Sequence, residues 1–152
     1  MAEQASGVSA AGYDRLRRDY ADATEQFVGR ILVVEDNALN LKLVRDVLQV
    51  AGYEVIEATT GEQGIVLALE GRPDLILMDL QLPGIDGSEA LRTIRSDPRT
   101  SAIPIVAVSA FAMKADRERA YRDGFDGYLE KPISVRALPD QVSGFLKARP
   151  DE

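Results

Sequence analysis

The chain has 152 residues, 45% of them hydrophobic, so it is long enough to bury one core and fold as one domain. Its 18 basic and 25 acidic residues give a net charge of -7, which argues against a protein that binds nucleic acid through clustered lysine and arginine. The sequence contains neither cysteine nor histidine, which excludes disulfide bonds, thiolate metal sites and a phosphohistidine carried by the chain itself.

Residues 1–28 are predicted to form an N-terminal extension. Small and polar residues come first, and apolar side chains then recur at spacings of three and four: Tyr13, Leu16, Tyr20, Ala23 and Phe27. This spacing fits an amphipathic helix or a loosely docked segment. Because no stretch approaches the roughly 20 apolar residues of a membrane span, and no secretory signal is present, we expect a cytoplasmic protein without membrane insertion.

From Arg30 onward, short apolar runs alternate with longer stretches of helical period, the pattern of a parallel sheet covered by helices. The predicted strands are residues 31–34, 54–58, 75–78, 105–108 and 127–129. The predicted domain covers residues 29–149 and is followed by a short tail over residues 150–152.

A helix is predicted after each strand, and the first has the clearest pattern. Its expected buried face consists of Leu41, Val44 and Leu48, with Leu43, Val47 and Val50 beside them. Gly52 is expected to end this helix. Weaker patterns of the same period lie over residues 62–69, 88–94, 116–121 and 135–146.

Polar residues follow four of the five predicted strands. They are Glu35 and Asp36 after the first strand, Asp79 after the third, Ser109 after the fourth and Lys131 after the fifth. In an open parallel sheet, ligands bind beyond the carboxyl ends of the strands, so these side chains are expected to converge. Each of them alone fits equally well as a helix cap, a turn or a loop residue. Their joint position favours a functional site.

Three close carboxylates repel one another unless a cation lies among them, and a hard divalent ion such as Mg²⁺ suits oxygen ligands. Asp79 ends an otherwise apolar strand and is the best placed nucleophile for phosphoryl transfer. Lys131 can pair with Asp79 or with a phosphoryl oxygen, and Ser109 can donate a hydrogen bond to the same oxygen.

Four motifs carry a resemblance to a known family: Val-Val-Glu-Asp-Asn, Leu-Met-Asp-Leu-Gln-Leu-Pro-Gly-Ile-Asp-Gly, Val-Ser-Ala and Lys-Pro. In this order and spacing they resemble the signature of response-regulator receiver domains, over Arg30 to about Leu146. The resemblance implies a doubly wound α/β fold of the flavodoxin-like (βα)5 type with strand order 2-1-3-4-5.

The same resemblance implies roles for individual residues. Asp79 would be the phosphoacceptor, and Glu35, Asp36, Asp79 and the backbone carbonyl of Gln81 would hold Mg²⁺. Ser109 and Tyr128 would form the switch pair, and the bond between Lys131 and Pro132 would be cis. Phe111 is bulky at a position where receivers vary, which leaves the rate of dephosphorylation open.

The segments over residues 36–43 and 110–116 are similar to DivK-type single-domain regulators. After Lys131 and Pro132 only one helix and a tail are predicted, so the expected output is a protein contact rather than DNA binding. The partners implied are a histidine kinase or phosphotransfer protein and a downstream protein. The donor is expected to dock near Asn37, Ala38, Leu41 and residues 132–133, and the target on residues 113–121, Tyr128 and the last helix. A monomer or a phosphorylation-dependent dimer is expected, with no enzymatic activity beyond self-catalysed phosphoryl acceptance and slow dephosphorylation.

Two other functions fit parts of the pattern. Phosphohydrolases of the haloacid-dehalogenase type carry a second Asp two residues after the nucleophile, where this chain has Gln81, which cannot act as acid and base. A receiver-like scaffold that works without phosphorylation usually lacks Asp79, Lys131 or the acidic pair, and all of these are present.

Overall fold

A computed structural model describes residues 27–111 and 113–148 of the chain. The predicted extension over residues 1–28 therefore lies, apart from its last two residues, outside the described residues, and so does the tail over 150–152. Within the described ranges, no helix is both long enough and apolar enough to cross a membrane.

The strands form one parallel five-stranded sheet in the order β2-β1-β3-β4-β5. They are β1 (Arg30–Val34), β2 (Glu54–Ala58), β3 (Leu75–Asp79), β4 (Ile105–Ser109) and β5 (Gly127–Glu130). The doubly wound fold and its strand order are confirmed. Each predicted strand is present, with ends that differ by no more than one residue.

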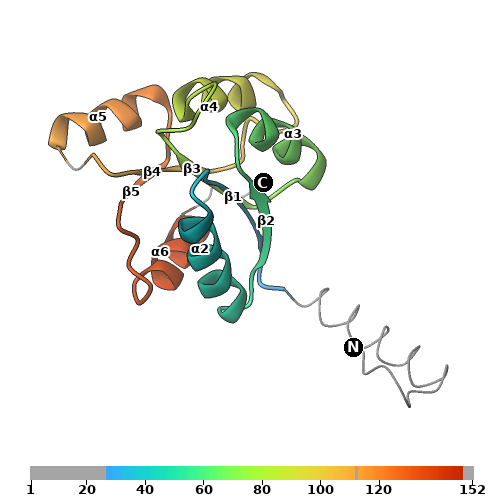
Figure 1. Ribbon diagram of the computed structural model, residues 1–152. Coiled ribbons are helices and arrows are strands. Elements are labelled where there is room, and N and C mark those ends of the chain that lie inside the picture. Colours follow the sequence, from blue (N-terminus) through green and yellow to red (C-terminus); the bar gives the residue numbers. More distant parts are fainter. Residues whose placement is uncertain (1–26, 112, 149–152) are drawn as a thin grey trace, which may run out of the picture.

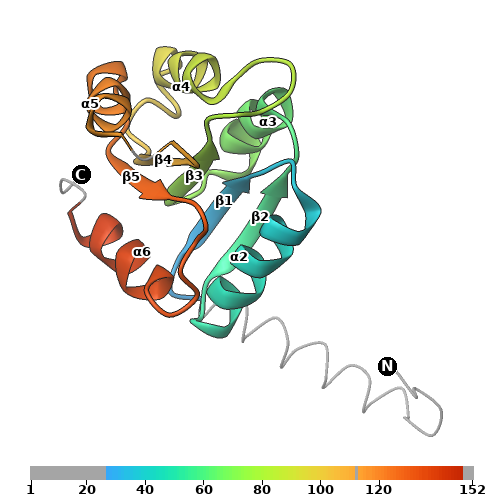
Figure 2. The same cartoon turned by 60° about the vertical axis from the view of Figure 1, so that its left-hand side comes forward.

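Helices cover both faces of the sheet (Figure 1). They are α2 (Ala38–Val50), α3 (Gly61–Gly71), α4 (Gly87–Ser96), α5 (Lys114–Asp123) and α6 (Leu138–Lys147). Helices α2 and α6 pack on one face, and α3, α4 and α5 pack on the other (Figure 2). The carboxyl edge of the sheet is therefore fixed by layers on both sides.

The buried strands alternate between two apolar cores, because successive side chains of a strand point to opposite faces. In β3, Ile76 and Met78 belong to the core under α3, α4 and α5, whereas Leu75 and Leu77 belong to the core under α2 and α6. Burying a side chain of this size stabilises the fold by about 2 kcal/mol. A strand packed on both faces gives Asp79 at its end a rigid support.

Side chains cap three of the helices that follow strands. The side-chain oxygens of Asn37, Thr60 and Asp86 accept hydrogen bonds from the backbone N–H groups of Asn40, Gln63 and Glu89. Each bond satisfies one of the N–H groups that a helix leaves unpaired at its start. These caps set where α2, α3 and α4 begin.

Two details of the predicted helices are wrong. Leu43 and Val50 are 38% and 90% exposed, because two and nine residues after Leu41 an α-helix has turned a side chain about 200° and 180° away from the direction of Leu41. The last helix begins at Leu138 rather than at residue 135. Pro139 explains this start, since proline has no N–H to donate and fits the first turn of a helix. The prediction that Gly52 ends α2 is confirmed, with φ of 101° just beyond the C-cap Ala51.

Candidate functional site

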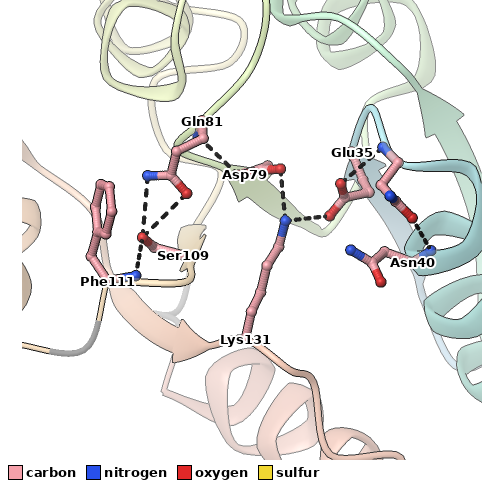
Figure 3. Close-up of polar contacts among 8 residues, drawn as sticks. Glu35, Asn40, Asp79, Gln81, Ser109, Phe111 and Lys131 are labelled. Carbon is pink, nitrogen blue, oxygen red and sulfur yellow. Dashed lines mark hydrogen bonds and ion pairs between the residues drawn. The ribbon is translucent and has the colours of Figure 1, made fainter.

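The polar residues predicted to converge do lie together at the carboxyl edge of the sheet (Figure 3). Asp79 and Ser109 end β3 and β4, Glu35 follows β1, and Lys131 follows β5. Because the strands run parallel and pair in register, their last residues fall at one edge. The topology alone therefore assembles a site from four separate segments.

Asp79 is the most enclosed carboxylate of the site, with 2% of its surface exposed. Its Oδ2 accepts a hydrogen bond from Lys131 Nζ at 2.8 Å, and its Oδ1 accepts one from the backbone N–H of Gln81 at 2.9 Å. Gly87 lies against the backbone carbonyl of Asp79, where an added Cβ would come within 2.5 Å. Any larger residue at the start of α4 would displace this part of the site.

Glu35 is also buried, with 5% of its surface exposed. One oxygen lies 3.0 Å from Lys131 Nζ, and the other accepts a hydrogen bond from the backbone N–H of Asn37 at 3.0 Å. Burial is the main cause that raises the pKa of Glu35, and the negative charge of Asp79 adds to it. The hydrogen bonds from Asn37 and Lys131 oppose this rise without cancelling it.

Lys131 bridges the two buried carboxylates. Burial lowers the pKa of its ammonium, but the hydrogen bonds and charges of Asp79 and Glu35 outweigh burial, so the net pKa is raised. Its backbone N–H also donates to the carbonyl of Ser109 at 2.8 Å, which ties it to the end of β4. The Lys131-Pro132 peptide bond is cis, as expected.

The carboxylates of Glu35, Asp36 and Asp79 fit a divalent cation. One oxygen from each lies within 4.8 Å of the others, and Asp36 is exposed while the other two are buried. Lys131 is the single ammonium between two of these groups, so the cluster keeps an excess of negative charge. Hard oxygen ligands with this excess suit Mg²⁺. A role for the Gln81 backbone carbonyl as a further ligand stays a prediction.

The side chain of Gln81 is a site feature that the sequence argument missed. Its Nε2 lies 3.2 Å from Ser109 Oγ, and the backbone N–H of Phe111 donates to the same Oγ at 3.0 Å (Figure 3). The spacing held a signal, because Gln81 follows Asp79 by two residues and β4 lies beside β3. An amide has too many possible uses for its sequence position alone to identify this partner.

Tyr128 lies beside the loop that follows β4. Its hydroxyl donates a hydrogen bond to the backbone carbonyl of Phe111, and the guanidinium of Arg117 lies 5.5 Å from its ring centroid. Arg117 in turn contacts Glu130 at 2.6 Å. The predicted switch residues Ser109 and Tyr128 are therefore both connected to Phe111, although switching itself stays a prediction.

One part of the expected docking surface is wrong. Leu41 is only 7% exposed and packs in the core under α2 and α6, as its helical period requires. Asn37 and Ala38 are exposed as expected. An open cavity of about 280 Å³ beside the site is lined by Asn40, Leu43, Val44, Ala110, Lys131, Pro132 and Ile133. The predicted loop at residues 132–133 borders this cavity.

Comparisons with known proteins agree with the geometry. The family described as response regulator receiver domain matches residues 31–143. The chain is 45% identical over 116 residues to the polar-differentiation response regulator DivK of Brucella anthropi, covering 76% of this chain and 94% of that protein.

Solved structures give the same result. A receiver domain of a sensor histidine kinase from Pseudomonas aeruginosa, with a magnesium ion coordinated in its active site cleft, is 35% identical, with a TM-score of 0.72 over 78% of this chain and 98% of that one. The chemotaxis response regulator CheY4 of Vibrio cholerae is 26% identical, with a TM-score of 0.73 over 76% of this chain and 97% of that one. The chain belongs to the family of response regulator receiver domains.

Proposed function

We propose that this protein is a single-domain response regulator that accepts a phosphoryl group on Asp79 with the help of Mg²⁺ and signals through protein contacts. The observation that carries this proposal is the pairing of a buried Asp79 with Lys131, at 2.8 Å, inside a cluster of three carboxylates. A buried carboxylate that pairs with one cation and lies where a second cation can bind is suited to act as a nucleophile in phosphoryl transfer.

The transfer forms a bond between a carboxylate oxygen of Asp79 and the phosphorus of a phosphohistidine or a small acyl phosphate. The donor's P–N or P–O bond breaks, and its electron pair leaves with the imidazole nitrogen or the carboxylate oxygen. Both side-chain oxygens of Asp79 accept hydrogen bonds, one from Lys131 and one from the backbone N–H of Gln81, and a carboxylate nucleophile needs no separate base to remove a proton. This explains how a site without histidine could carry out the step.

Glu35, Asp36 and Asp79 would hold the metal, joined by the backbone carbonyl of Gln81. Mg²⁺ would neutralise negative charge on the transferred group. Lys131 exchanges one carboxylate oxygen of Asp79 for a phosphoryl oxygen, which keeps its positive charge paired. Its position between Asp79 and Glu35 also keeps it fixed before transfer.

Ser109 would donate a hydrogen bond to a phosphoryl oxygen once the loop after β4 shifts toward the site. That loop carries Phe111, whose carbonyl accepts the hydroxyl hydrogen of Tyr128. A shift of the loop would therefore change the surface around Tyr128, Met113 and Tyr121. Met113 and Tyr121 are both largely exposed in α5 and just before it, which suits a surface read by a downstream protein.

The donor would be a histidine kinase or a histidine phosphotransfer protein that docks over the cavity between α2 and the loop after β5. Exposed Leu43 and partly buried Ile133 offer apolar contacts there, beside Lys131. Leu43→Asp is expected to slow transfer from such a protein and to leave acceptance from a small phosphodonor unchanged. Equal slowing with both donors would contradict this docking site.

The identity of 45% to DivK of Brucella anthropi supports a DivK-type role, in which the chain acts without enzymatic output. We propose a cytoplasmic protein that is a monomer or dimerises on phosphorylation.

Intact-mass analysis after incubation with acetyl phosphate tests the function. Wild type with Mg²⁺ is expected to gain one phosphoryl group, whereas wild type without Mg²⁺ and Asp79→Asn with Mg²⁺ are expected to gain none. No adduct on wild type would contradict the proposal and favour a constitutive scaffold, and an adduct on Asp79→Asn would assign the chemistry to another residue.

A further inference from the structure

The hydroxyl of Ser109 is held from two sides in the unmodified protein. The backbone N–H of Phe111 donates to its Oγ at 3.0 Å, and the side-chain amide of Gln81 places Nε2 at 3.2 Å and Oε1 at 3.4 Å from the same atom. Ser109 has none of its surface exposed. Solvent therefore offers this hydroxyl no alternative partner.

A serine hydroxyl can donate one hydrogen bond and accept two. The N–H groups of Phe111 and Gln81 occupy the accepting side, and Gln81 Oε1, 3.4 Å from Oγ, accepts the hydroxyl hydrogen. A phosphoryl oxygen on Asp79 would need that hydrogen. Ser109 cannot give it to the phosphoryl group until it leaves the amide of Gln81.

Gln81 contacts both the proposed phosphoacceptor Asp79 and the hydroxyl of Ser109. Its backbone N–H donates to Asp79 Oδ1 at 2.9 Å while its side chain contacts Ser109 (Figure 3). When Ser109 Oγ moves, the N–H of Phe111 loses its acceptor, and Phe111 is also the residue whose carbonyl accepts the bond from Tyr128. The contact between Gln81 and Ser109 is thus the first of a chain of contacts that reaches Tyr128.

We propose that Gln81 is a positioning residue, whose side-chain amide holds the Ser109 hydroxyl away from the phosphoryl position and so sets how readily the site responds to a phosphoryl group. This inference rests on the proposed function. Gln81 acts through Ser109 and needs no contact of its own with the phosphoryl group.

A double-mutant cycle with beryllofluoride, an analogue of a phosphoryl group, tests the proposal in the presence of Mg²⁺. The four proteins are wild type, Gln81→Met, Ser109→Ala and the double variant, and the measured quantity is the apparent dissociation constant of beryllofluoride. Methionine keeps the length of glutamine and removes both polar atoms. Gln81→Met is expected to bind about fivefold more tightly than wild type, the size expected for removal of one competing neutral hydrogen bond. In the Ser109→Ala background the same change is expected to have no effect.

A tightening that persists in Ser109→Ala would overturn the proposal, because Gln81 would then act on the ligand or on the fold and not through Ser109. Equal binding by wild type and Gln81→Met would overturn it as well. If wild type binds no beryllofluoride, the proposed function fails and this inference fails with it. If wild type binds beryllofluoride but Gln81→Met binds it no more tightly, only this inference fails.

The backbone amide of Phe111 gives a second, spectroscopic readout, because its hydrogen bond to Ser109 Oγ reports where the hydroxyl lies. In unmodified Gln81→Met, its NMR chemical shift is expected to move from the wild-type value toward that of wild type with Mg²⁺ and beryllofluoride. Gln81→Ala is expected to move it in the same direction, since it removes the same amide from an exposed position. An unchanged chemical shift of the Phe111 amide in both variants would contradict the proposal that the Gln81 side chain positions Ser109 Oγ.

Discussion

Both ends of the parallel sheet carry charged side chains, but they arrange them differently. At the amino end, Arg30 pairs with Glu54 at 3.0 Å and Arg95 pairs with Asp126 at 2.6 Å, in two separate places. The Glu54 and Asp126 side chains are 40% and 49% exposed. At the carboxyl end, Glu35 and Asp79 share one ammonium, and their side chains are 6% and 2% exposed.

The amino end shows what charges do when they only stabilise. Asp126 Oδ2 accepts hydrogen bonds from Arg95 and from the backbone N–H of Ile105 at 2.8 Å, so it closes the start of β4. Arg30 donates from its side chain to the carbonyl of Gly71 at 2.6 Å. Arg30, Arg95 and Asp126 each hydrogen-bond to backbone groups here, and solvent screens the remaining charge.

The difference teaches that charge alone does not identify the functional end of this sheet. The functional end is identified by acidic side chains that lie close together and are buried. Like charges held away from water are unfavourable unless a ligand or cation compensates them. Among the described residues, the one group of three acidic side chains close enough to share a metal ion lies at the carboxyl end.

The largest effect is expected at Lys131. Lys131→Met keeps an unbranched apolar chain but removes the ammonium that contacts Asp79 and Glu35. Phosphoryl acceptance from acetyl phosphate is expected to slow on the order of 100-fold, since a preorganised cation is lost from the transfer site. Single-turnover kinetics by mass spectrometry measure this rate, and a slowing of less than about threefold would show that Lys131 is only a structural partner.

Addition of Mg²⁺ is the next test. At 100 times its dissociation constant, Mg²⁺ is expected to raise the free energy of unfolding of wild type by about 2.7 kcal/mol, because it binds the folded site alone. Asp36→Asn is expected to lose much of this gain, and Asp126→Ala, at the other end of the sheet, is expected to retain it. Urea unfolding with and without chelator measures the gain, and equal gains in wild type and Asp36→Asn would argue against Asp36 as a ligand.

A smaller effect is expected for Asp126→Ala. The change leaves the N–H of Ile105 without its acceptor and is expected to lower the free energy of unfolding by about 1–2 kcal/mol. The exposed ion pair with Arg95 adds little to this loss. Phosphoryl acceptance by the folded variant should equal that of wild type. If acceptance fell while the fold survived, the two ends of the sheet would not be independent.

The smallest effect concerns pH. Burial raises the pKa of Glu35 above its ordinary value of 4.5, so folding favours the protonated form of this carboxyl. Without Mg²⁺, its contribution to stability is therefore fully present below pH 4.5 and is lost as the pH rises through the raised pKa. The difference in urea midpoint between wild type and Glu35→Gln, followed against pH, isolates this group. A difference that moves in the opposite direction would mean that the hydrogen bonds to Glu35 dominate over its burial.

Much of this contrast was predictable from the sequence, because it follows from strand order. Apolar runs identified all five strands, and the polar residues after them identified Glu35, Asp36, Asp79, Ser109 and Lys131. Other features depend on tertiary geometry. Leu41 was predicted both on the buried face of its helix and on the docking surface, and only the first is confirmed, since a buried residue is not available to a partner.

The contacts of Gln81 and Gly87 also needed the fold. Gln81 meets Ser109 across neighbouring strands, 28 residues away along the chain. Gly87 is required because α4 lies close to the backbone carbonyl of Asp79. No local sequence pattern predicts this contact. The start of α6, in contrast, could have been predicted from the sequence. Pro139 indicates the first turn of a helix, but the apolar period extended back to residue 135 and gave too early a start.

Chemical trapping of the modified residue tests the central claim most directly. Borohydride reduces an aspartyl phosphate to homoserine, so wild type treated with acetyl phosphate, Mg²⁺ and then borohydride can be digested and mapped by mass spectrometry. We predict homoserine at position 79 alone, dependent on Mg²⁺. Homoserine at position 36, or at no position in a folded protein exposed to donor and Mg²⁺, would contradict the assignment of Asp79 as the phosphoacceptor.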